Sequence, residues 1–296
     1  MNLMKQNQIM IKISDIVLSI SSSQPLESIR LEESYRDFMC TEEPVVTICA
    51  CYSGLPQILL QDKDKIFDSE MVWSLYQENG RNIFVLTSPV LGPFPYRIAI
   101  FDRGFRKGNV FNHIPNPQET INELLPNPLE FPLSEALMIC LLAQGRGIMV
   151  HACGVSVNGC GFLFAGNSTH GKTTMARLWK NKAVILNDDR IVIRNKEGRF
   201  WMYGTPWHGE YTGVSPQGVP IEKIFFLNHA ERNNAVRCNG TDAVSMLLTR
   251  SFPPLWDAKG MQFSLDFCAK LVEAIPCYEL KFFPDENIMD YVRCVN

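Results

Sequence analysis

Near its middle the chain reads Gly161-Phe-Leu-Phe-Ala-Gly-Asn-Ser-Thr-His-Gly-Lys-Thr-Thr174, which predicts a strand, a glycine-bounded loop and the first turn of a helix. Gly166 to Thr173 fits the pattern G-x-x-x-x-G-K-[ST], which is typical of phosphate-binding P-loops. Two glycines let the backbone curl so that its N–H groups point inward and form an anion-binding nest. The helix expected from about Lys172 adds free N–H donors and the positive end of its dipole.

The side chains of this loop suit the chemistry of a nucleotide. Lys172 would place its charge on the β- and γ-phosphates, and the Thr173 hydroxyl would bind Mg²⁺, a hard ion that accepts oxygen ligands. His170 holds a variable position of the pattern, where a solvent-facing side chain without a role is the simpler interpretation. The residues expected to contact the nucleotide are Gly166, Asn167, Ser168, Thr169, His170, Gly171, Lys172, Thr173 and Thr174.

The composition is that of an ordinary soluble globular protein, with 46% hydrophobic and 20% charged residues among 296. The net charge of −3 gives no electrostatic reason to expect nucleic acid or an anionic membrane as partner. Apolar runs are shorter than the roughly 20 residues of a membrane span, and Met1–Gln8 lacks a signal-peptide core, so we expect a cytoplasmic protein. The ten cysteines form no C-x-x-C pair, and buried, reduced thiols are expected.

The chain is predicted to form two domains. Residues 1–130 show strand patterns, among them a hairpin over Trp73–Leu86 with Asn79-Gly80 at its tip. This β-rich part either recognises a substrate or partner or is a purely structural sheet. A short helical piece is expected over 119–124, and the proline-punctuated segment Leu125–Pro132 predicts the boundary to a second domain, 131–296.

The second domain is expected to be α/β with a mixed sheet. A buried helix over 133–143 precedes a strand over Ile148–Val157, and Asn158-Gly159 turns it directly into the strand of the P-loop. An all-parallel sheet would need a helical crossover at this place. A further strand over Ala183–Arg194 carries Asp188 and Asp189, and helices are expected over 241–252 and 264–275.

Three segments together resemble the catalytic domain of HPr kinase/phosphorylase. They are His151-Ala-Cys-Gly-Val155, the P-loop, and Leu186-Asn-Asp-Asp-Arg190, which match that family's His-Gly strand, P-loop and Ala-Asp-Asp strand in order and spacing. The segment Tyr203-Gly-Thr-Pro-Trp-His-Gly-Glu210 is more similar to an HPr-kinase-related branch found with peptide-modification systems, which includes lasso-peptide kinases. The resemblance covers about 146–296 and implies a phosphoenolpyruvate-carboxykinase-like core.

This resemblance implies phosphoryl transfer from ATP, with Mg²⁺, to a hydroxyl group. Asp188 would be the base for the acceptor hydroxyl and Asp189 would bind or orient Mg²⁺, although the two roles could be exchanged. His151 would orient the aspartate or contact the γ-phosphate. His208 and Glu210 lie in a loop that either covers the acceptor side or is only a rigid, aromatic-packed connection.

The chain departs from HPr kinases at three matched positions. Thr174 replaces a Glu, Asn187 replaces the Ala before the aspartates, and Ala152 replaces a Gly. No counterpart of their HPr-contacting C-terminal helix is recognisable. These departures argue against HPr as substrate and against phosphorylase activity. The expected function is a kinase acting on a serine-type hydroxyl of a peptide or protein. A small-metabolite kinase and a non-catalytic nucleotide-binding module are the alternatives, and the oligomeric state, including a homo-oligomer, is left open.

Overall fold

A computed structural model describes residues 8–22, 24–26, 29–58, 60–61, 64–113, 124–285 and 287–295. The chain divides into two compact units between Cys140 and Leu141, within helix α1 (Leu133–Leu142). The boundary predicted at 130/131 stays a prediction, and the helical piece predicted over 119–124 falls outside the described residues apart from Leu124.

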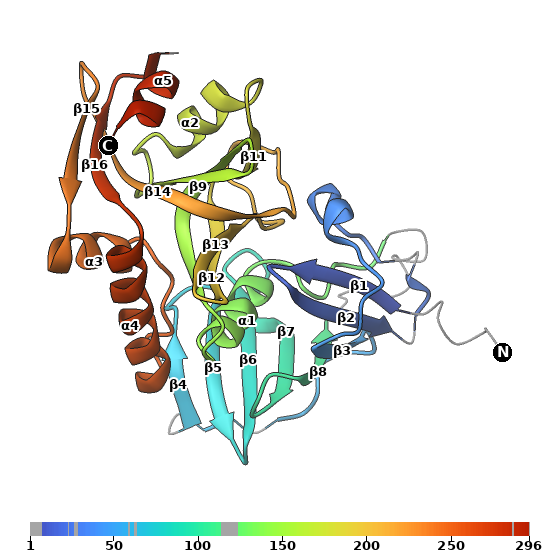
Figure 1. The fold of residues 1–296 in the computed structure, drawn as a ribbon. Coiled ribbons are helices and arrows are strands. Elements are labelled where there is room, and N and C mark those ends of the chain that lie inside the picture. Colours follow the sequence, from blue (N-terminus) through green and yellow to red (C-terminus); the bar gives the residue numbers. More distant parts are fainter. Residues whose placement is uncertain are drawn as a thin grey trace. The chain divides into compact units, whose positions relative to one another are not determined.

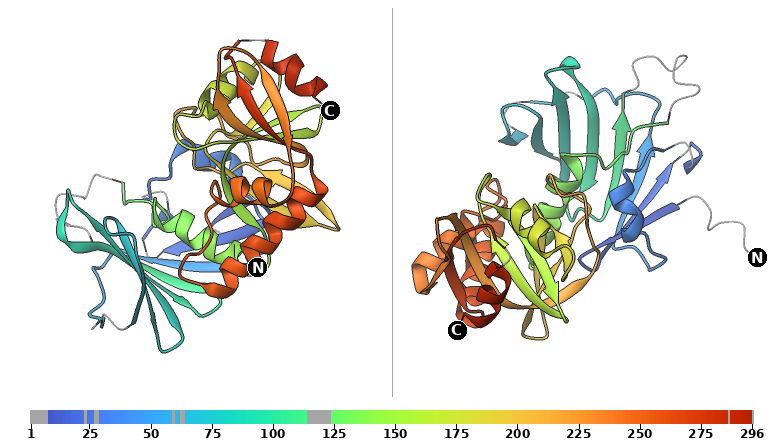
Figure 2. Two further views of the ribbon diagram at one scale, coloured as in Figure 1. Left: turned by 90° about the vertical axis from the view of Figure 1, so that its left-hand side faces the viewer. Right: turned by 90° about the horizontal axis from the view of Figure 1, so that it is seen from above.

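The first unit, Met1–Cys140, contains one twisted sheet (Figures 1 and 2). In the described residues the strand order is β1-β2-β3-β8-β7-β6-β5-β4. Strand β3 pairs in parallel with both β2 and β8, and the other neighbours are antiparallel. The elements are β1 (Gln8–Ile13), β2 (Ile16–Ser22), a 3₁₀ helix (Glu33–Phe38), β3 (Val46–Cys51), β4 (Lys65–Asp68), β5 (Trp73–Glu78), β6 (Arg81–Ser88), β7 (Gly92–Asp102) and β8 (Lys107–Asn112).

The second unit, Leu141–Asn296, contains a second sheet and the segment 166–173, which fits the P-loop pattern and is called the P-loop below. The order of its described strands is β10-β9-β12-β13-β14-β16-β15, β10 also pairs with β14, and β11 pairs with β9. The strands are β9 (Ile148–Val157), β10 (Cys160–Ala165), β11 (Val184–Asn187), β12 (Arg190–Lys196), β13 (Arg199–Tyr203), β14 (Gly218–His229), β15 (Asn234–Cys238) and β16 (Cys277–Phe282). The helices are α2 (Lys172–Trp179), α3 (Gly240–Leu248), α4 (Ala258–Ala274) and α5 (Asn287–Cys294).

This sheet is mixed, as the sequence predicts. β9 and β10 form the antiparallel hairpin, while β10, β14 and β16 run parallel to one another. Two apolar clusters cover the sheet. Helices α3 and α4 contribute Ala243, Leu247 and Leu271 to one cluster, and helices α2 and α5 contribute residues such as Trp179 and Ile288 to the other. The helices are therefore divided between two apolar layers, and the P-loop leads into α2 (Figure 1).

Several predicted elements differ in their bounds. The strand predicted over Ala183–Arg194 is broken at Asp188 and Asp189, which form a bend between β11 and β12. Helix α3 ends at Leu248, before the predicted end, and α4 begins at Ala258, six residues earlier than predicted, because Asp257 caps it by accepting a hydrogen bond from the backbone N–H of Lys259 at 3.0 Å.

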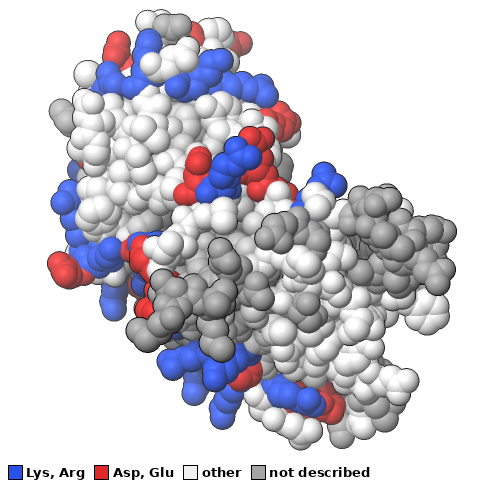
Figure 3. Space-filling view, turned by 90° about the vertical axis from the view of Figure 1, so that its right-hand side faces the viewer, with Lys and Arg blue, Asp and Glu red and all other residues white. Residues whose placement is uncertain are grey.

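The distribution of charged side chains and of cysteines can be compared with what the composition predicts. Lysine and arginine side chains lie beside aspartate and glutamate side chains on the face shown in Figure 3.

All ten cysteines are free, as predicted, but Cys160 and Cys294 are exposed and only Cys140, Cys153, Cys268 and Cys277 are buried. In the described part of the chain no helix has the length and apolar character needed to span a membrane.

Candidate functional site

The loop between β10 and α2 contains two residues with positive φ angles, a conformation that occurs in anion-binding nests. Thr169 and Gly171 have positive φ angles of 70° and 95°, so the chain curls back on itself before α2 begins. The N-cap of α2 is Gly171, and no side chain caps this helix end. Gly171 has no side chain to accept from the first N–H groups of α2, and such groups are donors that a bound anion can use.

Lys172 lies within this loop rather than in solvent. Its ammonium group donates a hydrogen bond to the carbonyl oxygen of Asn167 at 2.8 Å, and only 7% of the residue is exposed. Burial lowers the pKa of Lys172, although the nearby charges of Asp189 and Asp188 oppose this shift. A phosphate group that displaced the Asn167 carbonyl would restore a strong ionic partner to this buried ammonium group.

Asp188 is held beside the loop by donors from two separate segments. Its Oδ2 accepts a hydrogen bond from the Thr173 hydroxyl at 2.8 Å and one from the backbone N–H of Tyr211 at 3.0 Å. Its Oδ1 accepts one from the backbone N–H of Gly209 at 2.8 Å. A Cβ atom on Gly209 would lie 3.0 Å from Asp188 Oδ2, so glycine permits this close approach. With 1% exposure, Asp188 is a fixed carboxylate linked to the P-loop threonine.

Asp189 faces a different set of partners. Its Oδ1 lies 2.7 Å from Nε2 of His151, and its Oδ2 accepts a hydrogen bond from the Arg190 guanidinium at 2.6 Å. Burial raises the pKa of Asp189, but the hydrogen bond from His151 and the charge of Arg190 outweigh it and hold the pKa below its ordinary value. Asp189 is thus a carboxylate at neutral pH, and 24% of its side chain is exposed.

Sheet register brings His151 to this place. Residues His151 and Arg190 are partners in the β9–β12 pairing, so the histidine lies opposite the residue that follows Asp189. The backbone N–H of His151 donates to the carbonyl of Arg250 at 2.7 Å, and its carbonyl accepts from the N–H of Gly166 at 3.2 Å. His151 therefore joins the start of the P-loop to the bend at Asp188 and Asp189, which is called the acidic bend below.

Asn187 shapes the bend, a role that the sequence analysis did not assign. Its amide nitrogen donates to the carbonyl oxygens of Thr205 and Trp207, both at 2.9 Å. Its amide oxygen accepts from the backbone N–H groups of Asp189 at 2.6 Å and Arg190 at 2.7 Å. The residue is fully buried. An asparagine before two aspartates at the end of an apolar strand is a typical turn signal, but its two carbonyl partners are distant in sequence.

The remaining predicted residues lie at the edges of this site. His208 is exposed, and its Nδ1 lies 2.9 Å from the carbonyl oxygen of Gly209. Glu210 lies 3.5 Å from Arg177 of α2, with 80% of its side chain exposed. The ring of His170 is partly buried, and its Nδ1 has no hydrogen-bond partner among the described residues. The loop that carries His208 and Glu210 reaches the acidic bend through backbone groups, not through these side chains.

The donor set suits Mg²⁺ better than a metal held by protein alone. Among the residues that the structure describes, no three His, Cys, Asp or Glu side chains gather into a metal-ligand set. Mg²⁺ usually binds through one or two carboxylates together with substrate phosphates and water. The adjacent oxygens of Thr173 and Asp188 could supply the protein part of such a site.

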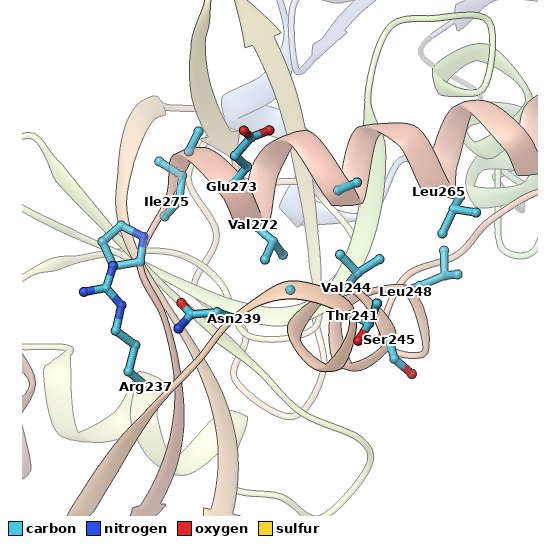
Figure 4. A pocket seen from close by; sticks show the side chains of 14 residues that line it. Arg237, Asn239, Thr241, Val244, Ser245, Leu248, Leu265, Val272, Glu273 and Ile275 are labelled. Atoms are coloured by element: carbon cyan, nitrogen blue, oxygen red, sulfur yellow. The ribbon is translucent and has the colours of Figure 1, made fainter.

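An apolar groove lies elsewhere in the second unit. Its volume is about 850 Å³, and α3, α4 and the end of β15 line it with mostly apolar side chains, among them Val244, Leu248 and Val272 (Figure 4). Arg237 and Glu273 are its charged residues. None of the P-loop residues or the aspartates lines this groove, so it is separate from the phosphate-binding candidate.

Comparisons with known proteins found a weak structural similarity and no sequence match. No protein-family model matches the chain, and no curated protein sequence matches it. A search of solved structures found the Hpr(Ser) kinase/phosphatase from Coxiella burnetii, with a TM-score of 0.31 and 10% sequence identity. The match covers 49% of this chain and 85% of that one. At this similarity the comparison decides neither fold nor activity.

Proposed function

We propose that the second unit is a kinase that transfers the γ-phosphoryl group of ATP to a serine-type hydroxyl of a peptide or protein. The observation that carries this proposal is the junction of three separate segments: the P-loop, the acidic bend and the strand that carries His151. Thr173 contacts Asp188 at 2.8 Å, while Asp189 contacts His151 at 2.7 Å. The peptide class of acceptor, and the phosphoenolpyruvate-carboxykinase-like core, are supported by the resemblance of the motifs alone.

The geometry favours exchanging the roles first expected for the two aspartates. Asp188 is fully buried, accepts three hydrogen bonds and contacts the P-loop threonine, so it suits the metal side. Asp189 is partly exposed and is paired with a histidine, so it suits the acceptor side. A bound Mg²⁺ would neutralise phosphate charge and orient the phosphates.

The residues of this chain then have separate tasks. The loop amides and Lys172 would bind and orient the phosphates of ATP. Asp189 would accept the proton of the acceptor hydroxyl as that oxygen bonds to the γ-phosphorus and the bond to the β–γ bridging oxygen breaks, releasing ADP. His151 would hold the Asp189 carboxylate in position through its 2.7 Å contact.

The proposal is tested by incubating the full chain with ATP labelled on the γ-phosphate, Mg²⁺ and a cell extract. Label is expected in a peptide or protein fraction. Asp189→Asn is expected to lower transfer by about 10²-fold or more while ATP still binds, because only the base is lost. Asp188→Asn is expected to weaken Mg²⁺-dependent ATP binding as well. The exposed Asp266 of α4 provides the control, and Asp266→Asn should match the unaltered chain.

Three results would contradict the proposal in whole or in part. ATP binding without any label transfer would leave only a nucleotide-binding module. Transfer that is indifferent to Asp189→Asn would show that the acidic bend does not serve the reaction. Label found only in a small molecule would keep the kinase chemistry but overturn the peptide acceptor.

A further inference from the structure

The three parallel strands of the second unit end at one edge of the sheet. β10 is followed by the P-loop, β14 by residues 230–233, and β16 by residues 283–285. In open α/β sheets, ligands bind outside the carboxyl ends of parallel strands. The segments after β14 and β16 are thus placed at the edge where the P-loop lies.

Direct contacts join these two strand ends to the P-loop. Nε2 of His229, the last residue of β14, lies 2.9 Å from the carbonyl oxygen of Thr169. A Cβ atom on Gly171 would lie 2.4 Å from Cζ of Phe282 and 3.0 Å from Cε1 of His229, so the loop packs closely on both residues. Their rings lie 5.0 Å apart.

The acidic bend lies beside β9, whereas the contacts just described join the P-loop to β14 and β16. Asp188 and Asp189 lie between β11 and β12, which both pair with β9, so β9 separates them from β10, and β13 separates β12 from β14. The ends of β14 and β16 contact the loop at Thr169 and Gly171, so a triphosphate whose terminal phosphate faces the aspartates can extend its other end toward these two strands. The nucleoside of such a ligand would meet the segments that follow these strands.

Those segments offer groups that suit a purine base. Phe283 is a large aromatic residue with 46% exposure, and its backbone N–H donates to Oδ1 of Asn233 at 2.8 Å. Asn233 also lines a polar hollow of about 810 Å³, together with Lys281 and the other residues of 230–234. Exposed aromatic faces stack on bases, and an amide side chain can pair with a base edge. The hollow carries two basic residues, Arg232 and Lys281, and one acidic residue, Glu231.

We infer that Phe283 and Asn233, with the hollow beside them, form the site for the purine base of the nucleotide. This inference rests on the proposed function, because it takes the P-loop to bind a nucleoside triphosphate. It adds a base-recognition site at the carboxyl ends of β14 and β16, on the side of the loop away from the acidic bend.

The test compares two ligands that share a phosphate chain but differ in the nucleoside. Binding of ATP and of inorganic tripolyphosphate, each with Mg²⁺, is measured by calorimetry on the full chain. Phe283→Ala is expected to weaken ATP binding about tenfold and to change tripolyphosphate binding less than about twofold, because only stacking is lost. Phe283→Trp should retain ATP affinity. Leu255→Ala removes another exposed apolar residue, 69% exposed, and should change neither ligand.

The outcomes separate this inference from the proposed function. If the unaltered chain binds neither ligand, the proposed function falls and the base site falls with it. If it binds both and Phe283→Ala changes neither affinity, or lowers both equally, the base site is wrong while phosphate binding by the P-loop stands.

Discussion

At the scale of single residues, Asn187 is the most constrained polar side chain of the site. We predict that Asn187→Ala lowers the free energy of unfolding by on the order of 2–5 kcal/mol, because two carbonyls and two N–H groups lose their buried partners. Urea unfolding followed by circular dichroism measures this change. Residual folded protein should also show weaker phosphoryl transfer, since the bend that carries Asp188 and Asp189 loses its anchor.

A second asparagine gives the matched control for this prediction. Asn195 accepts one hydrogen bond, from the backbone N–H of Gly198 at 3.0 Å, in an exposed turn. Asn195→Ala should cost about 1 kcal/mol or less, because water can replace the lost partner. Equal losses for the two substitutions would contradict the role given to Asn187.

Lys172 makes the affinity for phosphates depend on pH. Burial holds its pKa below the ordinary value, so the ammonium charge is lost as pH rises through a pKa lower than that of a free lysine. We predict that ADP affinity, measured by calorimetry without magnesium from about pH 7 to about pH 11, falls by at most tenfold per unit above the pKa. Lys172→Gln should bind weakly, without this decline. A constant affinity of the unaltered chain would contradict the prediction.

At the scale of elements, the P-loop depends on Gly171 for its shape and for its contact with β16. We predict that Gly171→Ala destabilises the chain by about 2–4 kcal/mol and removes nucleotide affinity. The φ of 95° is unfavourable for alanine, and the added Cβ atom would clash with the Phe282 ring. Gly159→Ala has a similar φ of 81° in open space, so it should cost only about 1–2 kcal/mol and keep the affinity. Urea unfolding and calorimetry measure both effects, and equal effects would contradict the packing argument.

Local sequence signals predict most elements around the site but not their breaks. The hairpin of β9 and β10 and the start of α2 are confirmed, because Asn158-Gly159 and the glycines of the P-loop specify them locally. The bend at Asp188 and Asp189 could not be read from the apolar run, since it depends on Asn187 bonding to Thr205 and Trp207. Strand β15 was missed because it has only five residues, none of them buried, and lies at a sheet edge.

At the scale of the whole molecule, the sequence named the candidate residues but could not supply their pairing. The motifs indicate which residues carry the chemistry. The register of β9 against β12 places His151 beside Asp189. The backbone N–H groups of Gly209 and Tyr211 hold Asp188 beside Thr173. Such contacts join residues far apart in sequence, so they follow from packing and not from any local pattern.

The two units should respond differently to nucleotide. We predict that Mg²⁺ and ATP slow amide hydrogen exchange in the second unit, at the P-loop and the acidic bend, because the groups proposed to contact phosphate all lie there. Peptides from the sheet of β1–β8 should exchange unchanged. Hydrogen-exchange mass spectrometry on the full chain, with Lys172→Gln as the control that shows no slowing, measures this. Equal protection of both units would contradict the assignment of the site.

The central claim is that the loop between β10 and α2 binds a triphosphate whose last phosphate faces the acidic bend. A crystal structure with Mg²⁺ and a non-hydrolysable ATP analogue tests it most directly. We predict the phosphates on the backbone N–H groups of residues 166–173, with Mg²⁺ beside Thr173 and Asp188 and the γ-phosphate nearest Asp189. An analogue bound elsewhere, or a bound triphosphate with both aspartates turned away, would contradict the account.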